Sequence, residues 1–166
     1  MDKEIAAKVK YWRDLLKRIL AVAIFLGERG LAFRGSSNKI DDNNNGNFLG
    51  IIQLLAQFDP VLEEHVSKVK QSQKTGQRFQ AHYLSADSQN DFIKACSSKV
   101  VQEIHAERER SKYFSILVDA TPDCSHAEQS TFILRYVLDC NSSFVVKERF
   151  LAFIDYNKKR DKILQI

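Results

Sequence analysis

The sequence predicts an α+β fold, with an N-terminal helical region followed by a three-stranded antiparallel meander that would form only part of a sheet. Apolar residues recur every three or four positions through much of residues 3–110, which is the spacing of an amphipathic helix. After residue 110 they gather instead in short runs rich in Phe, Ile, Leu, Val and Tyr, which favour strands. The 166 residues are 44% hydrophobic, enough to build a core, and only 6 Gly and 2 Pro argue against a disordered or fibrous chain.

The first helix is expected from about Lys3 to Glu28. We expect Trp12 to anchor a core rather than to form a platform for a ligand. Residues 35–46 are polar, and such side chains favour turns because they bond to the nearby backbone. The helix is predicted by one continuous apolar stripe, which consists of Ile5, Val9, Trp12, Leu16, Ile19, Ala23 and Leu26.

Three further helices are expected before the strands. Asn47 can cap the first of them. Asp59 followed by Pro60 is typical of a helix cap and a first-turn proline, and indicates the second. The third is a long helix over about residues 86–110. The charged side chains within residues 103–110 match i,i+4 pairing on a solvated helix face.

Three apolar segments of strand length follow the helical region. They are Tyr113–Asp119, Thr131–Leu138 and Phe144–Ile154. The link over residues 139–143 is short and rich in turn-forming residues, so the second and third segments should form an antiparallel hairpin. Three strands make an incomplete sheet with an unpaired edge.

Asp119 is the main candidate for chemistry. The apolar run Phe114–Val118 predicts a buried strand that ends at Asp119, and a second carboxylate, Asp123, follows. Burying a charge is costly unless the charge is paired or binds a metal. Two-metal phosphoryl chemistry needs several carboxylates that converge. With 47 residues left after Asp119, we expect the chain to carry the opening of such a site and not the rest. Asp123 has a structural alternative, as a cap of the turn after Pro122.

Other site chemistries are disfavoured. Cys124 and His126 lie two residues apart, but no partner pair has the spacing of a zinc site. Phosphate-binding glycine loops and the common hydrolase motifs are absent from the sequence. The three cysteines are widely spaced, as expected for reduced thiols of an intracellular protein. No apolar run reaches the ~18–20 residues of a membrane-spanning helix, so no membrane partner is expected.

The positive charge of the chain is concentrated near its N-terminus. The net charge is +4, and residues 1–39 hold nine Lys and Arg against four Asp and Glu. A basic helix face can bind nucleic-acid phosphates. The candidate contacts are Lys10, Arg13, Lys17 and Arg18. The alternative is an ordinary solvated helix face.

Several stretches together resemble a known family. They include Trp12-Arg13-Asp14-Leu15-Leu16-Lys17-Arg18-Ile19, residues 25–35, 45–50, 59–62, 83–85 and 89–93, and Tyr113-Phe114-Ser115-Ile116 with Asp119, Thr121 and Asp123. In these stretches the chain resembles the uncharacterised domain of hAT-superfamily transposases and of domesticated proteins derived from them, such as zinc finger MYM-type and TTF-type proteins. The resemblance covers nearly all of residues 8–156.

The resemblance implies a division of the chain and a role for Asp119. Residues 1–110 correspond to a helical region, residues 111–156 to the start of an RNase H-like catalytic domain, and residues 157–166 to a divergent tail. Asp119 matches the first member of an Asp-Asp-Glu triad that binds magnesium or manganese in a complete domain. The other two members are expected in segments that this chain lacks, so the chain alone should hold no cofactor.

The expected function follows from the same resemblance. We expect a fragment of a hAT transposase-derived protein that is not an enzyme by itself, since Ala120 also replaces an acidic residue that is common in the family. Its parent role would be DNA transposition or DNA-associated regulation in the nucleus, with weak and non-specific DNA binding. The alternative is a helical module that binds a protein partner and has no nucleic-acid function.

Overall fold

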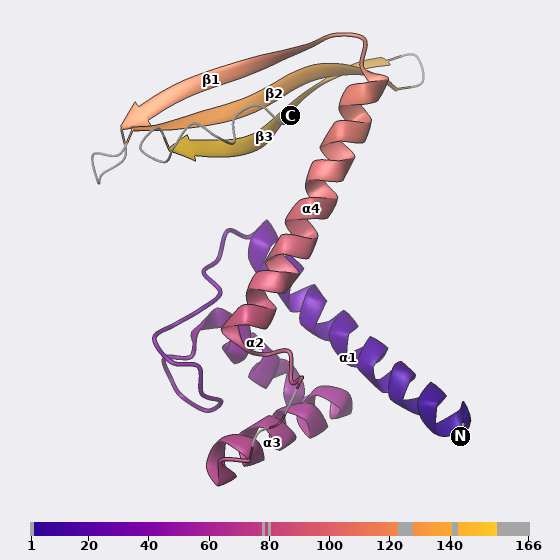
Figure 1. The fold of residues 1–166 in the computed structure, drawn as a ribbon, viewed down its shortest axis with the longest axis vertical. Helices are drawn as coiled ribbons and strands as arrows, with labels where there is room; N and C mark the ends of the chain where they lie inside the picture. The colour runs from indigo at the N-terminus through magenta and orange to yellow at the C-terminus, as the bar shows by residue number, and fades with distance from the viewer. Residues whose placement is uncertain (1, 78, 80, 123–127, 141–142, 156–166) are drawn as a thin grey trace. The chain divides into compact units, whose positions relative to one another are not determined.

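The computed structural model describes residues 2–77, 79, 81–122, 128–140 and 143–155, and it confirms the α+β fold. Four helices precede a three-stranded sheet (Figure 1). The elements are α1 (Asp2–Glu28), α2 (Gly46–Ala56), α3 (Pro60–Thr75), α4 (Ala86–Arg110), β1 (Phe114–Pro122), β2 (Glu128–Cys140) and β3 (Ser143–Asp155). Within the described residues, every helix is too short or too polar to cross a membrane.

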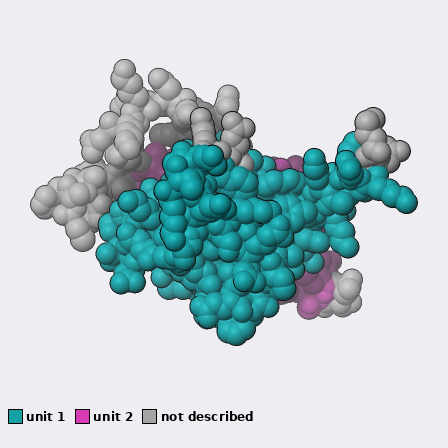
Figure 2. Space-filling model, turned by 90° about the horizontal axis from the view of Figure 1, so that it is seen from below, with its two compact units in different colours: residues 1–97 teal, residues 98–166 magenta. Residues whose placement is uncertain are grey.

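The chain divides into two compact units, which Figure 2 shows in different colours. Unit 1 comprises residues 1–97 and unit 2 comprises residues 98–166, so the boundary falls within α4. This division concerns packing and does not test the predicted boundary after residue 110, which stays a prediction.

The core of unit 1 is built mainly by α1, α2 and α3. The buried stripe of α1 differs from the predicted one: it includes Leu15, and its contacts with the core begin only at Tyr11. The predicted members Ile5 and Val9 are 55% and 49% exposed, because the first turns of α1 have no buried partner among the described residues. The fully buried large side chains of this core are Leu15, Ile19, Leu26, Phe48, Ile52, Leu62 and His65.

The loop between α1 and α2 is held by a close backbone approach at Gly35 and Gly46. A Cβ atom on Gly35 would lie 2.0 Å from the carbonyl oxygen of Asn44. Gly46 has a φ of +84°, which disfavours a side chain there. The amide of Phe48 donates to the carbonyl of Phe33 over 3.0 Å, and the two rings stack. The loop therefore depends on the absence of a side chain at both glycines.

The caps of α2 and α3 test two predictions. The predicted cap at Asn47 is wrong: α2 begins at Gly46, and the capping residue is Asn45, whose side chain bonds to Lys39 and Gln53 instead of the helix amides. Asn47 lies in the first turn, where its amide donates to a loop carbonyl. The predicted cap at Asp59 is confirmed, because its carboxylate accepts from two amides of the first turn of α3 at 3.0 and 3.1 Å.

The sheet of unit 2 is the predicted antiparallel meander. The strand order is β1-β2-β3, and Asp119 of β1 pairs with Thr131 of β2. One irregularity lies in the β2–β3 pairing, at Phe132 and Ile133 of β2. The expectation that β1 ends at Asp119 is wrong, because the strand continues to Pro122.

Only one face of this sheet carries a core in the described residues. Leu134, Tyr136 and Leu138 of β2 are buried together with Ile104 of α4. Side chains alternate between the faces of a strand, so the intervening residues of β2 point to the opposite face.

The prediction that Phe114–Val118 is a buried strand is wrong for the described residues. Phe114, Ile116 and Val118 are 53%, 49% and 53% exposed. The physical reason is position: β1 is at the edge of the sheet, whereas the buried row comes from the central strand β2. An apolar run predicts a strand but does not show which strand becomes central.

Candidate functional site

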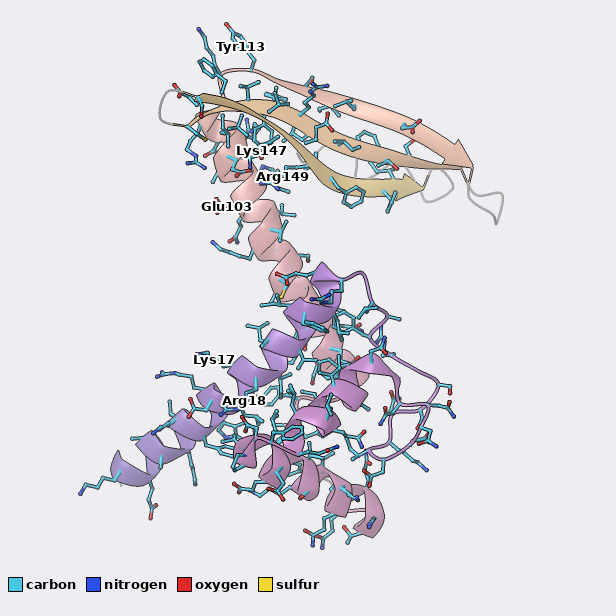
Figure 3. The ribbon with its side chains drawn as sticks, turned by 180° about the vertical axis from the view of Figure 1, so that it is seen from behind. Lys17, Arg18, Glu103, Tyr113, Lys147 and Arg149 are labelled. Atoms are coloured by element: carbon cyan, nitrogen blue, oxygen red, sulfur yellow. The ribbon has the colours of Figure 1, made fainter. Side chains whose placement is uncertain are left out.

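Three of the predicted nucleic-acid contacts share one exposed face of α1. Lys10, Arg13 and Lys17 are spaced by three and four residues, so they lie on the same side of the helix. All three are exposed, and none forms an ion pair with a described residue. Figure 3 shows Lys17 pointing away from the neighbouring helices of unit 1. We call these three residues the α1 basic face.

The structure places the fourth predicted contact, Arg18, in an ion pair within unit 1. Its Nε atom lies 2.6 Å from Oδ2 of Asp59, and its Nη1 donates to the carbonyl of Asp14 over 2.8 Å. The hydrogen bond from Arg18 holds the pKa of Asp59 below its usual value, and the amides at the start of α3 act in the same direction. Arg18 therefore links α1 to the cap of α3, and we leave it out of the α1 basic face.

Trp12 anchors the core, as predicted, within a cluster that the sequence did not reveal. Its ring meets those of Tyr11, His65 and Tyr83 edge-on, at centroid distances of 5.3, 6.1 and 5.6 Å. His65 is fully buried, and its Nε2 lies 2.7 Å from the carbonyl oxygen of His82. Burial lowers the pKa of His65 and favours the neutral ring. Nε2 then carries the proton, and Nδ1 accepts from the hydroxyl of Tyr11 over 3.2 Å.

Asp119 is exposed on the face of the sheet opposite α4. It shares its row with Thr131 of β2 and Phe153 of β3, and neither offers a carboxylate. In the part of the chain that the structure describes, no three His, Cys, Asp or Glu side chains gather as metal ligands. Asp123, Cys124 and His126 lie outside the described residues.

A partly buried ionic cluster on the other face was not predicted. Glu107 of α4 accepts a short hydrogen bond from the hydroxyl of Tyr136, and Nη2 of Arg149 lies 3.1 Å from its Oε2. The Glu107 side chain is only 12% exposed. The Tyr136 hydroxyl and then the Arg149 guanidinium lower the pKa of Glu107, because both favour its charged form.

The cluster corrects the prediction of i,i+4 pairing within residues 103–110. Glu107 pairs with Arg149, which lies 42 positions away in the sequence. No i,i+4 ion pair occurs in the described part of α4. The only other ion pair in this segment is a loose one at 4.0 Å between Arg108 and Glu109. A charged helix end thus fixes α4 to the sheet through Tyr136 and Arg149. The signal available in the sequence was only a cluster of charges, which did not identify the partner.

Comparison with known proteins identifies a family. The sequence model of the family described as the ZMYM1/FAM200 RNase-like domain (DUF4371) matches residues 1–165. The match therefore spans both units and includes residues 157–165. No solved structure matches the chain.

Proposed function

Because the chain belongs to the ZMYM1/FAM200 RNase-like domain family, we propose that it is a domesticated, transposase-derived domain that associates with DNA in the nucleus and does not cleave DNA by itself. The family membership supports the transposase-like origin and a nuclear setting. The observation that carries the DNA association is the α1 basic face.

The α1 basic face can bind a polyanion such as DNA, but it does not distinguish one base sequence from another. Three cations that have no carboxylate partner among the described residues line one side of a helix, where they can lie along a phosphate backbone. Phosphate contacts position a protein on DNA but carry no sequence information, and the described residues of α1 present no pattern of base-reading side chains. The proposed binding is therefore weak, non-specific and sensitive to salt.

The absence of cleavage is proposed from the surroundings of Asp119. A two-metal site needs several carboxylates within a few ångström of one another, so that paired cations can activate water and stabilise the leaving oxygen. Asp119 has Thr131 and Phe153 as its row neighbours. In a complete site Asp119 would supply one oxygen ligand for magnesium or manganese, and further carboxylates would have to come from elsewhere.

The DNA association can be tested with the variant Lys10→Gln, Arg13→Gln, Lys17→Gln. We expect its affinity for a fluorescent 20-base-pair duplex to fall strongly. The slope of log K against log salt should become shallower by about 2.7, which is 0.9 for each of three phosphate contacts. The measurement is fluorescence anisotropy across a salt titration.

A matched control removes the same charge elsewhere. The variant Lys74→Gln, Lys94→Gln, Lys99→Gln changes three exposed lysines outside α1. This control variant should keep most of the affinity for the duplex and nearly all of the slope of log K against log salt. An equal loss in both variants would show that only net charge matters, and binding that selects one sequence at moderate salt would contradict the proposed mode.

An alternative function is protein binding through the helices of unit 1. One observation favours it: Phe58, two residues after the end of α2, is 80% exposed, and Leu54 and Leu55 near the end of α2 are 53% and 39% exposed. Apolar side chains gathered in this way can mark an interaction surface. If the unaltered chain fails to bind any duplex at low salt, the DNA proposal fails and this alternative gains support.

A further inference from the structure

We propose that the junction of α4 and β1 binds single-stranded nucleic acid, with exposed aromatic rings stacking on bases and adjacent cations holding phosphates. This surface, called the junction site, consists of Arg108, Arg110, Lys112, Tyr113 and Phe114. It belongs to unit 2 and shares no residue with the α1 basic face, so it stands or falls separately from the function proposed above.

The junction site presents two neighbouring aromatic rings to solvent. Tyr113 is 73% exposed and Phe114 is 53% exposed. Tyr113 lies at the end of the sheet and points away from the strands (Figure 3). Rings of this size usually contribute much of their area to a core or an interface. Here most of the Tyr113 surface remains available to a ligand with a flat apolar face.

Each ring has a cation on one of its faces. The guanidinium of Arg108 lies 5.7 Å from the ring centroid of Phe114, and Nζ of Lys112 lies 5.3 Å from that of Tyr113. These are cation–π distances. Because Tyr113 is 73% exposed, a base can stack on its ring while the phosphate remains within reach of Lys112.

The charge balance favours an anionic ligand. Residues 108–114 contain three cations, Arg108, Arg110 and Lys112, against one carboxylate, Glu109. The nearby carboxylate of Glu107 does not offset them, because its charge is compensated by Arg149. Glu109 approaches Arg108 only at 4.0 Å on an exposed surface, which is a weak interaction.

The combination of exposed rings and cations favours a single strand over a duplex. Bases in a duplex are already stacked on their neighbours, so their faces are not available to Tyr113 or Phe114. Unpaired bases can stack on aromatic rings whatever their sequence, and base–aromatic stacking with flanking cations is the usual mode of non-specific single-strand binding. A duplex could use only the cations of the junction site.

The test compares Tyr113→Ala with Tyr113→Phe in the full chain. Probes are fluorescent 12-nucleotide oligo(dT) and oligo(rU) and a duplex of 12 base pairs, measured by anisotropy at about 50 mM salt. We expect Tyr113→Ala to weaken binding of the single strands about tenfold, from the loss of one stacked base. Tyr113→Phe should bind like the unaltered chain, because it keeps the ring. The oligo(rU) probe shows whether RNA is accepted as well as DNA.

Charge variants at the same surface provide the second measurement. Lys112→Gln should reduce the salt slope for oligo(dT) by about 0.7, which is one single-strand phosphate contact. Lys94→Gln, an exposed lysine of α4 distant in sequence from the rings, should not change it. Repeating the Tyr113 variants in the Lys10→Gln, Arg13→Gln, Lys17→Gln background separates the two surfaces, since the tenfold loss should persist there.

Several results would overturn the junction site. One is single-strand binding that is equal in Tyr113→Ala and the unaltered chain. Another is a loss that is as large for the duplex as for oligo(dT), which would indicate charge or folding effects instead of stacking. Because Tyr113 is exposed and precedes β1, the circular dichroism spectrum of Tyr113→Ala should match that of the unaltered chain.

Discussion

Gly35→Ala is expected to lower the free energy of unfolding of unit 1 by about 3 kcal/mol or more, since overpacking against atoms that cannot move costs this much at its upper end. The added Cβ would lie 2.0 Å from the carbonyl oxygen of Asn44 and 2.8 Å from the amide nitrogen of Gly46. Both are backbone atoms, so no flexible side chain can move aside. The loop would have to open, and the pairing of the Phe48 amide with the Phe33 carbonyl would be lost with it.

The measurement is urea unfolding followed by the fluorescence of Trp12. Trp12 is the single tryptophan of the chain and lies in unit 1, so its signal reports the unit that contains Gly35. The matched control is Gly27→Ala in α1, where a Cβ would meet no atom within 4 Å. Alanine is the better helix residue, so this control should gain about 0.5–1 kcal/mol. Equal stability of the two alanine variants would contradict the account of the loop.

Tyr136→Phe is expected to lower the free energy of unfolding by about 2 kcal/mol at pH 7, because it removes a hydrogen bond to a charged, poorly hydrated carboxylate. The change leaves the buried ring in place and deletes only the hydroxyl that donates to Glu107. Arg149 remains paired with Glu107, so the carboxylate keeps part of its compensation. Urea unfolding followed by far-UV circular dichroism measures the effect on stability. The control Tyr113→Phe deletes the hydroxyl of an exposed tyrosine and should be neutral.

The loss of stability caused by Tyr136→Phe should become smaller at acidic pH. The native pKa of Glu107 lies below its ordinary value of 4.5. The stabilisation from the charged carboxylate is therefore complete above pH 4.5 and is lost as the pH falls through the native pKa. The difference between Tyr136→Phe and the unaltered chain should shrink over the same range. A difference that stays constant as the pH falls through the native pKa of Glu107 would mean that the hydroxyl acts through packing and not through the carboxylate.

Local features of the fold could be predicted from the sequence. The apolar stripe placed α1 within a residue of its observed bounds, because a long amphipathic pattern constrains a helix strongly. Asp59 was identified as a cap because Asp followed by Pro satisfies the first amides of a helix locally. The hairpin of β2 and β3 followed from the short polar link between two apolar segments.

Features that depend on distant partners could not be predicted in the same way. The exposure of Ile116 and Val118 depends on the edge position of β1, which the apolar run itself does not encode. The pairing of Glu107 with Arg149 joins α4 to β3 and has no sequence spacing to detect. For the candidate site, the excess of basic residues near the N-terminus predicted Lys10, Arg13, Lys17 and Arg18 as contacts, but only the structure showed that Arg18 is paired with Asp59.

The central claim, that this domain holds DNA without cutting it, is tested most directly by incubating the purified chain with end-labelled DNA and magnesium or manganese. The salt is kept low enough for a gel shift to show that the DNA is bound. We predict that the bound DNA is recovered intact and unjoined, because Asp119 has no carboxylate beside it in the described sheet. Metal-dependent cleavage or joining that Asp119→Asn abolishes would contradict this account and establish Asp119 as part of a working catalytic site.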